Sequence, residues 1–281
     1  VQTCALPICS IMPIVTLNGE LVWKRRTTTT QLRNWAAWLI GIAIISFAWH
    51  LISEKTVWFF VQDAPRQAAD MGARMVPPKW SYMSQLWKPA WDTINIASIG
   101  TIIAMVIAIP VAFAAARNTT PHLLVRSAAL FVIVSSRSVN SLIWALMLVF
   151  ILGPGILAGT IAIGLRSVGF CAKLLYEAIE EIDQSQVEAI EATGASRIQK
   201  IVYGILPQVM PTIAGVGIYR WDINIRESTI LGLVGAGGIG LQLSGSMNTL
   251  AWTQVSMILL VILATVFISE WVSAKVRGAI I

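Results

Sequence analysis

Long apolar segments separated by polar stretches dominate this sequence. Six of them are long enough, at about 1.5 Å per helical residue, to cross about 30 Å of hydrocarbon. These predicted spans are residues 35–52, 91–116, 127–152, 156–176, 208–234 and 254–272. The pattern therefore predicts an all-α membrane protein with about six transmembrane helices.

Two connections between the predicted spans are too long to be simple turns. Segment 53–90 is rich in Trp and Pro, which is typical either of a short amphipathic helix at the membrane surface or of a plain loop. Segment 177–207 carries six acidic residues, then Gly194 and Pro207. Because Gly ends helices and Pro opens them, we expect two short helices with a break near Thr193 and Gly194.

Composition and charge support a membrane location. The chain is 56% hydrophobic and 12% charged, against about 25% charged in soluble domains. If the N-terminus is cytoplasmic, eleven of the 20 Lys and Arg fall inside, five outside and four within spans. This bias predicts a cytoplasmic segment 10–34, an extracytoplasmic segment 53–90 and a cytoplasmic tail 275–281. The net charge is +6, but the basic residues form no patch of the kind that binds nucleic acid.

The chain begins with VQTCALPIC, which resembles a translated sequencing adaptor, so residues 1–9 are interpreted as a sequencing or cloning artefact. Span 35–52 is expected to be an uncleaved anchor, because basic residues precede it and no small-residue cleavage site follows. Cys171 is expected to be a small packing residue. The two His and three Cys form no metal-binding motif. The sequence also lacks the G-x-x-x-x-G-K-[ST] motif of nucleotide-hydrolysing proteins, so ATP-driven work would need a partner.

Charged residues within the predicted spans are candidates for function. Arg137, Arg166 and Arg220 are predicted at mid-depth, where a lipid-facing Arg costs at least about 2.5 kcal/mol. Each should therefore face the protein interior or water. Asp222 and Arg226 are four residues apart, which predicts a structural ion pair on one helix face.

The four span arginines exceed the two span acids, Asp222 and Glu227, by two charges. This excess suits a small oxyanion, because Arg binds phosphate-like oxygens in a bidentate way. The candidate substrate pathway comprises Arg137, Asn140, Arg166, Arg220, Asn224 and Arg226. Arg220, Asn224 and Glu227 share a helix face at i, i+4, i+7 spacing. Structural ion pairs between helices remain the alternative.

Residues 235–240, GAGGIG, match the nucleotide-binding pattern G-x-G-x-x-G, but residues 241–269 contain no Asp or Glu to complete that site. We instead expect an outer loop at the mouth of the pathway, either a flexible gate or a tightly packed turn. Its glycines are Gly235, Gly237, Gly238 and Gly240.

The string EAIEATG at 188–194, followed by Leu-Pro at 206–207, resembles the EAA loop of ABC importer permeases. Matching positions are Glu188, Ala189, Gly194, Leu206 and Pro207, whereas Ile190 and Gly204 depart from the pattern. The resemblance implies that 177–207 is a cytoplasmic coupling loop that docks on an ATPase subunit, with the Gly allowing close backbone approach.

Further strings within 75–275, including RSVNSLIWALMLVF at 137–150 and LGLVGAGGIG at 231–240, resemble the phosphonate ABC transporter permease family. That family implies a multi-pass protein of the bacterial inner membrane whose permease domain, 91–274, has the methionine-importer-like type I fold. It also implies a homodimer in the lipid bilayer with two ATP-binding cassette subunits, which hold the ATP-Mg, and an extracytoplasmic binding protein. The cargo would be phosphonate, phosphite or hypophosphite, and the chain itself would bind no cofactor and catalyse nothing. Departures from the family strings at 221–222 and 225–227 leave the cargo open.

Three alternatives remain at this point. The chain could be an ABC permease for another small solute. An ion-coupled secondary transporter could also carry midplane charges, although the sequence has no inverted repeat. A membrane-embedded enzyme is disfavoured, because the spans contain no nucleophile–base pair or metal cluster.

Overall fold

The structure, a computed structural model, describes residues 14–17, 20–23 and 28–280. The proposed artefact at residues 1–9 lies outside the described residues. The chain divides into two units, Val1–Ala69 and Asp70–Ile281, which are described separately.

The first unit holds a small hairpin and a long apolar helix. Strands β1 (Ile14–Leu17) and β2 (Glu20–Trp23) pair in an antiparallel way, an element that the hydropathy pattern did not predict. Helix α1 (Thr28–Lys55) contains the predicted anchor and is long and apolar enough to span a membrane. Helix α2 (Trp58–Met75) follows and ends in the second unit, so the plain-loop alternative for 53–90 is wrong.

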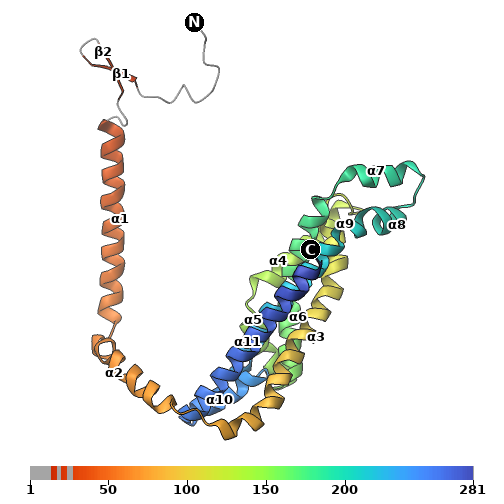
Figure 1. The fold of residues 1–281 in the computed structure, drawn as a ribbon. Helices are drawn as coiled ribbons and strands as arrows, with labels where there is room; N and C mark the ends of the chain where they lie inside the picture. The colour runs from red at the N-terminus through yellow and green to blue at the C-terminus, as the bar shows by residue number, and fades with distance from the viewer. Residues whose placement is uncertain (1–13, 18–19, 24–27, 281) are drawn as a thin grey trace. The chain divides into compact units, whose positions relative to one another are not determined.

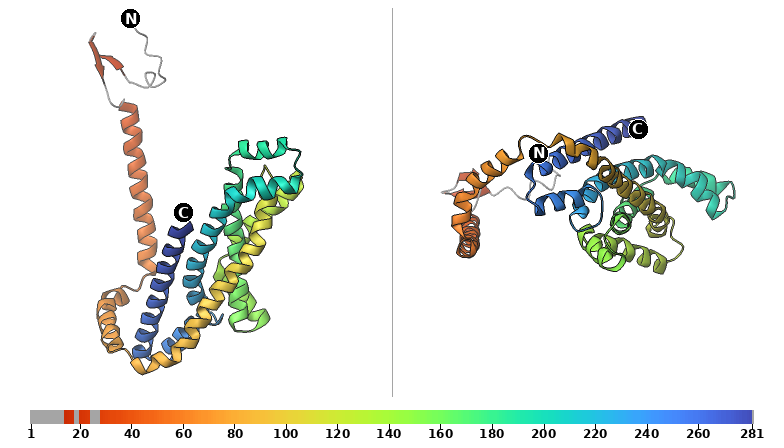
Figure 2. Two further views of the ribbon diagram at one scale, coloured as in Figure 1. Left: turned by 45° about the vertical axis from the view of Figure 1, so that its right-hand side comes forward. Right: turned by 90° about the horizontal axis from the view of Figure 1, so that it is seen from below.

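Four long helices form the body of the second unit: α3 (Met83–Ala115), α6 (Ile156–Glu180), α9 (Leu206–Gly232) and α11 (Trp252–Ile280). Helix α3, preceded by the 3-10 turn η2 (Trp80–Tyr82), packs along α6; both contact α9, and α11 packs on α9 (Figure 1, Figure 2). Helix α3 begins eight residues before the predicted start at residue 91, and its 33 residues extend about 50 Å.

The predicted third span, 127–152, is not one helix. It consists of α4 (Leu123–Ser138) and α5 (Ser141–Leu152), which are bent by 88° relative to each other. The Asn140 side chain accepts a hydrogen bond from the Leu142 backbone N–H and thereby caps α5. Among the described residues, five helices can therefore span a membrane, or six if this broken pair is one span.

The remaining elements lie at the two ends of the second unit. Helices α7 (Gln184–Ala192) and α8 (Arg197–Gln199) and the π-helical segment η3 (Lys200–Ile205) form one end, while α10 (Ile239–Asn248) lies toward the other (Figure 1).

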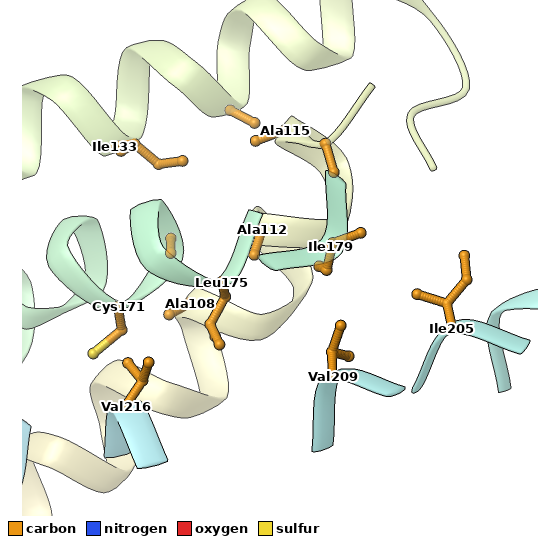
Figure 3. Packing of buried hydrophobic residues seen from close by; sticks show 13 residues of the cluster. Ala108, Ala112, Ala115, Ile133, Cys171, Leu175, Ile179, Ile205, Val209 and Val216 are labelled. Atoms are coloured by element: carbon orange, nitrogen blue, oxygen red, sulfur yellow. The ribbon is translucent and has the colours of Figure 1, made fainter. Parts of the chain in front are cut away.

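Small residues bring α3 and α6 close together. Ala108 and Ala112 of α3 are fully buried against a cluster that includes Cys171 and Leu175 of α6 (Figure 3). A Cβ atom added at Gly100 would lie 2.9 Å from Ile163 Cγ2, so this contact needs glycine. In lipid the hydrophobic effect does not drive helices together, so close van der Waals packing between small residues stabilises the contact instead.

Candidate functional site

A charge cluster lies between α6 and α9. Arg166 Nη1 lies 2.5 Å from Glu227 Oε1, and Arg220 Nη2 lies 3.3 Å from Glu227 Oε2. The side chains of Arg220, Glu227 and Arg166 are 3%, 15% and 33% exposed. One carboxylate thus holds two guanidinium groups, one at each oxygen, and the cluster retains one net positive charge.

Polar side chains from three helices hold Arg220 in place. Arg220 Nε donates to Ser167 Oγ at 2.9 Å, and the Ser167 hydroxyl donates to Asn224 Oδ1 at 3.2 Å. Asn224 Nδ2 in turn donates to Thr101 Oγ1 of α3 at 2.7 Å. The guanidinium carbon of Arg220 also lies 5.1 Å from the centre of the Phe170 ring. This network satisfies the buried polar groups and fixes the direction of Arg220.

The structure brings together part of the candidate pathway, namely Arg166, Arg220 and Asn224. Asn140 lies beside them, because its Oδ1 accepts from Ser141 Oγ at 3.3 Å and Ser141 Oγ accepts from Arg166 Nη1 at 3.3 Å. Arg137 is in the last turn of α4; it is exposed and makes no side-chain hydrogen bond or ion pair in the described part of the chain.

Sequence reasoning missed that Glu227 is the partner of both Arg166 and Arg220. The i, i+7 spacing had placed Glu227 on the same face as Arg220, which was the available signal. The partner Arg166 comes from another helix, which no spacing rule within one helix can reveal.

Arg226 belongs to a separate ion pair. Its guanidinium contacts Asp222 Oδ2, and Asp222 Oδ1 accepts a hydrogen bond from Ser269 Oγ of α11 at 2.8 Å. The structure therefore contains the pair expected from the sequence and uses it where α9 meets α11. This position favours a structural role over a place in the pathway.

The acidic segment has the expected break, but only its first helix is separate, because α8 continues through η3 into α9 as one helical stretch, Arg197–Gly232. Helix α7 ends at Ala192, Gly194 has φ +80°, and Ser196 and Gln199 form a capping box that starts α8. Glu188 is exposed and makes no side-chain hydrogen bond or ion pair within the described residues. Its carboxylate is thus available to a partner.

Several contacts hold the two short helices on the body of the unit. Arg197 Nη2 donates to the Thr119 carbonyl, between α3 and α4, at 2.6 Å. A Cβ atom at Gly204 would lie 3.3 Å from Ile190 Cδ1, so α7 packs closely against η3 at this glycine.

The ends of the acidic segment are also fixed locally. Hydrogen bonds from the Ser185 hydroxyl and backbone N–H lower the pKa of Asp183, so this carboxylate stays ionised as the cap of α7. The Gln208 side chain accepts from the Asp183 backbone N–H at 3.0 Å. Pro207 lies in the first turn of α9, which continues directly from the π-helical segment η3.

The glycine loop is a tight turn between α9 and α10. Gly235, Gly237 and Gly238 all have positive φ, and Gly235 accepts a backbone hydrogen bond from Gly155 at 3.0 Å. A Cβ atom at Gly240 would overlap the Thr229 carbonyl. This geometry favours packing over flexibility in the state described.

Comparison with known families decides the class of protein. Residues 108–278 match the family described as binding-protein-dependent transport system inner membrane component. The chain belongs to this family. It is therefore a permease subunit of an ABC importer rather than an enzyme, works with ATPase and binding-protein partners, and leaves the use of ATP to the ATPase. The family predicted from the EAA-like loop is confirmed, and the alternatives of an ion-coupled transporter and an enzyme are wrong.

Similar proteins narrow the comparison further. The phosphite transport system permease protein PtxC of Stutzerimonas stutzeri is 44% identical over 209 residues, 74% of this chain and 76% of PtxC. The phosphate-import permease protein PhnE of Mycolicibacterium smegmatis is 37% identical over 73% of this chain and 38% of PhnE. An inward-facing structure of the MetNI methionine ABC transporter matches with a TM-score of 0.63 at 20% identity, covering 72% of this chain and 99% of that chain. The predicted methionine-importer-like fold is confirmed.

Proposed function

We propose that this permease carries phosphite or a closely related phosphorus oxyanion, such as a phosphonate or hypophosphite, past Arg166 and Arg220. The observation that carries the proposal is the pair of guanidinium groups that converge on Glu227 between α6 and α9. Two arginines at one point match the oxygens of a small phosphorus anion. The similarity to PtxC supports the same class of cargo.

In the proposed assembly, two copies of this chain form the channel, and each binds one ATPase subunit through α7, Gly194 and α8. The N- and C-termini lie in the cytoplasm of a bacterial cell. The external binding protein delivers the anion at the opposite end, near the glycine loop at residues 235–240. ATP binding by the motor subunits moves the docked segment and changes which side of the membrane the cluster faces.

Uptake of radiolabelled phosphite by cells that lack the chromosomal copy tests the cargo. Cells that express the wild-type chain should accumulate label, and Arg220→Gln should lower the initial rate at least about tenfold, since a buried charged contact is worth more than about 1.4 kcal/mol. Arg74→Gln is the matched control, because Arg74 forms an exposed pair with Asp70 at 2.8 Å. Wild-type cells that take up no phosphite, or Arg220→Gln cells with normal uptake, would contradict the proposal and favour another small solute.

Orientation and stoichiometry are tested separately. A cysteine placed at Ser196, in a chain whose Cys4 and Cys9 are replaced by Ser, should react with a membrane-impermeant reagent only after the cells are opened, because the remaining Cys171 is buried. Two copies with different tags should co-purify if the channel is a homodimer. Labelling from outside intact cells would refute the proposed orientation, and recovery of only one tag would refute the homodimer.

A further inference from the structure

Glu227 occupies the position that an oxyanion would take between two arginines. Its two carboxylate oxygens lie 2.5 Å from Arg166 Nη1 and 3.3 Å from Arg220 Nη2. A phosphorus oxyanion also offers at least two oxygens, each able to accept from one guanidinium. Carboxylate and substrate would therefore compete for the same donors.

We infer that Glu227 is an internal counter-anion that fills the oxyanion site between Arg166 and Arg220, and that the transported anion displaces it. The inference rests on the proposed function for the class of anion. It goes further by assigning a role to an acidic residue that would otherwise repel the cargo.

The energetics of an empty site support this role. Two arginines that lose their counter-charge at mid-depth would repel each other and cost several kcal/mol. An internal carboxylate keeps the site stable when no cargo is present. Anion exchange then replaces one set of charge-assisted hydrogen bonds by another, with a small net cost.

The geometry also provides a route for exchange. Arg166 is one-third exposed, whereas Arg220 is almost fully buried, so an incoming anion meets Arg166 first. The contact between Arg166 and Glu227 joins α6 to α9, so movement of α9 against α6 lengthens it. The carboxylate of Glu227 can then rotate away while Arg220 stays bound to Ser167.

The charge sum predicts a preference among anions. With Glu227 ionised, the cluster has one net positive charge, which a monoanion such as hypophosphite neutralises. Without the carboxylate, the cluster has two net positive charges, which suit a dianion such as sulfate. Glu227 thus disfavours sulfate, a fully ionised dianion that leaves a charge imbalance, relative to hypophosphite or to a phosphite or phosphonate that carries one proton.

The test measures anion binding by the assembled importer in detergent, from the rise of Tm with increasing hypophosphite, phosphite or sulfate. Glu227→Gln should lower the half-maximal sulfate concentration at least about tenfold, as expected for a coupled charge pair, and more for sulfate than for hypophosphite. The double variant Glu227→Gln with Arg220→Gln should lose this gain. Asp222→Asn is the matched control, since it frees only one arginine, Arg226, and should give no comparable gain.

Equal sulfate responses of the wild type and Glu227→Gln would overturn the inference, as would a gain that persists in the double variant or appears equally in Asp222→Asn. If Glu227→Gln does not assemble, Glu227→Asp keeps the charge but shortens the reach to Arg166. It should then give a smaller gain in the same direction, and a wild-type response would again overturn the inference. If Glu227→Gln shows the expected gain in sulfate binding but cells that express the wild type take up no phosphite, the proposed cargo is refuted and the role of Glu227 stands.

Discussion

Replacement of Gly194 separates two reasons for a glycine in segment 177–207, the proposed docking segment for the ATPase subunit. Gly194 has φ +80°, and a Cβ atom there would meet no atom within 4 Å in this chain. The cost of Gly194→Ala is therefore entirely in the backbone, about 1–2 kcal/mol for a side chain in the left-handed region. At 1.4 kcal/mol per factor of ten, the equilibrium constant that favours the conformation with residue 194 at positive φ falls about 5–30-fold. Gly194→Asn should cost less, because Asn tolerates this region.

The assay is the affinity of the purified ATPase subunit for each permease variant, together with uptake in cells. We expect Gly194→Ala to bind about 5–30-fold more weakly and Gly194→Asn to bind nearly as well as the wild type. Gly245→Ala is the control, since it adds a Cβ in open space within helix α10. Wild-type affinity of Gly194→Ala would refute the backbone argument. Equal loss in both variants would instead mean that the ATPase approaches the Gly194 backbone too closely for any side chain.

Two further predictions concern packing and coupling. Gly169→Ala should lower the free energy of unfolding by about 1–3 kcal/mol, because its Cβ would lie 2.6 Å from the Ile133 carbonyl oxygen. Thermal unfolding in detergent measures the loss, and a Tm equal to that of Gly245→Ala would disprove the prediction. Arg197→Gln removes the hydrogen-bond donor to the Thr119 carbonyl at 2.6 Å. It should lower uptake per ATP hydrolysed by up to about tenfold, since such a bond contributes about 1.5 kcal/mol. An unchanged ratio of uptake to ATP hydrolysis in proteoliposomes would show that this contact does not couple the two processes.

Hydropathy recovers most spans because each depends only on an average over about 20 residues. Helices α1, α3, α6, α9 and α11 overlap their predicted segments. The break between α4 and α5 was missed because the same averaging hides a short polar run. Residues 135–141 contain five Ser or Asn side chains, which compete with helical hydrogen bonds. One of them, Ser136, accepts a hydrogen bond from the Gly169 backbone N–H of α6 at 3.0 Å.

The docking segment was predictable for a different reason. Gly194 permits a left-handed turn whatever the rest of the chain does, and the structure has the break there. Pro207, by contrast, lies inside the continuous helical stretch Arg197–Gly232 and does not mark a separate helix start. Arg197 and Thr119, which are in contact, lie 78 residues apart in the sequence. No local rule connects such distant positions, so the attachment of the segment to the body required the fold.

The charges show the same limit more sharply, since the sequence determines their sum but not their distribution. The excess of two positive charges within the spans could have been spread over three separate arginines. In the fold, Asp222 neutralises Arg226, and Glu227 holds Arg166 and Arg220 together, which leaves one charge at that cluster and the other at Arg137. A buried site with one net charge attracts a single anion, whereas isolated arginines would each need their own. The pairing across α6 and α9 therefore gathers part of the charge excess at one point, which is the basis of the proposed oxyanion site.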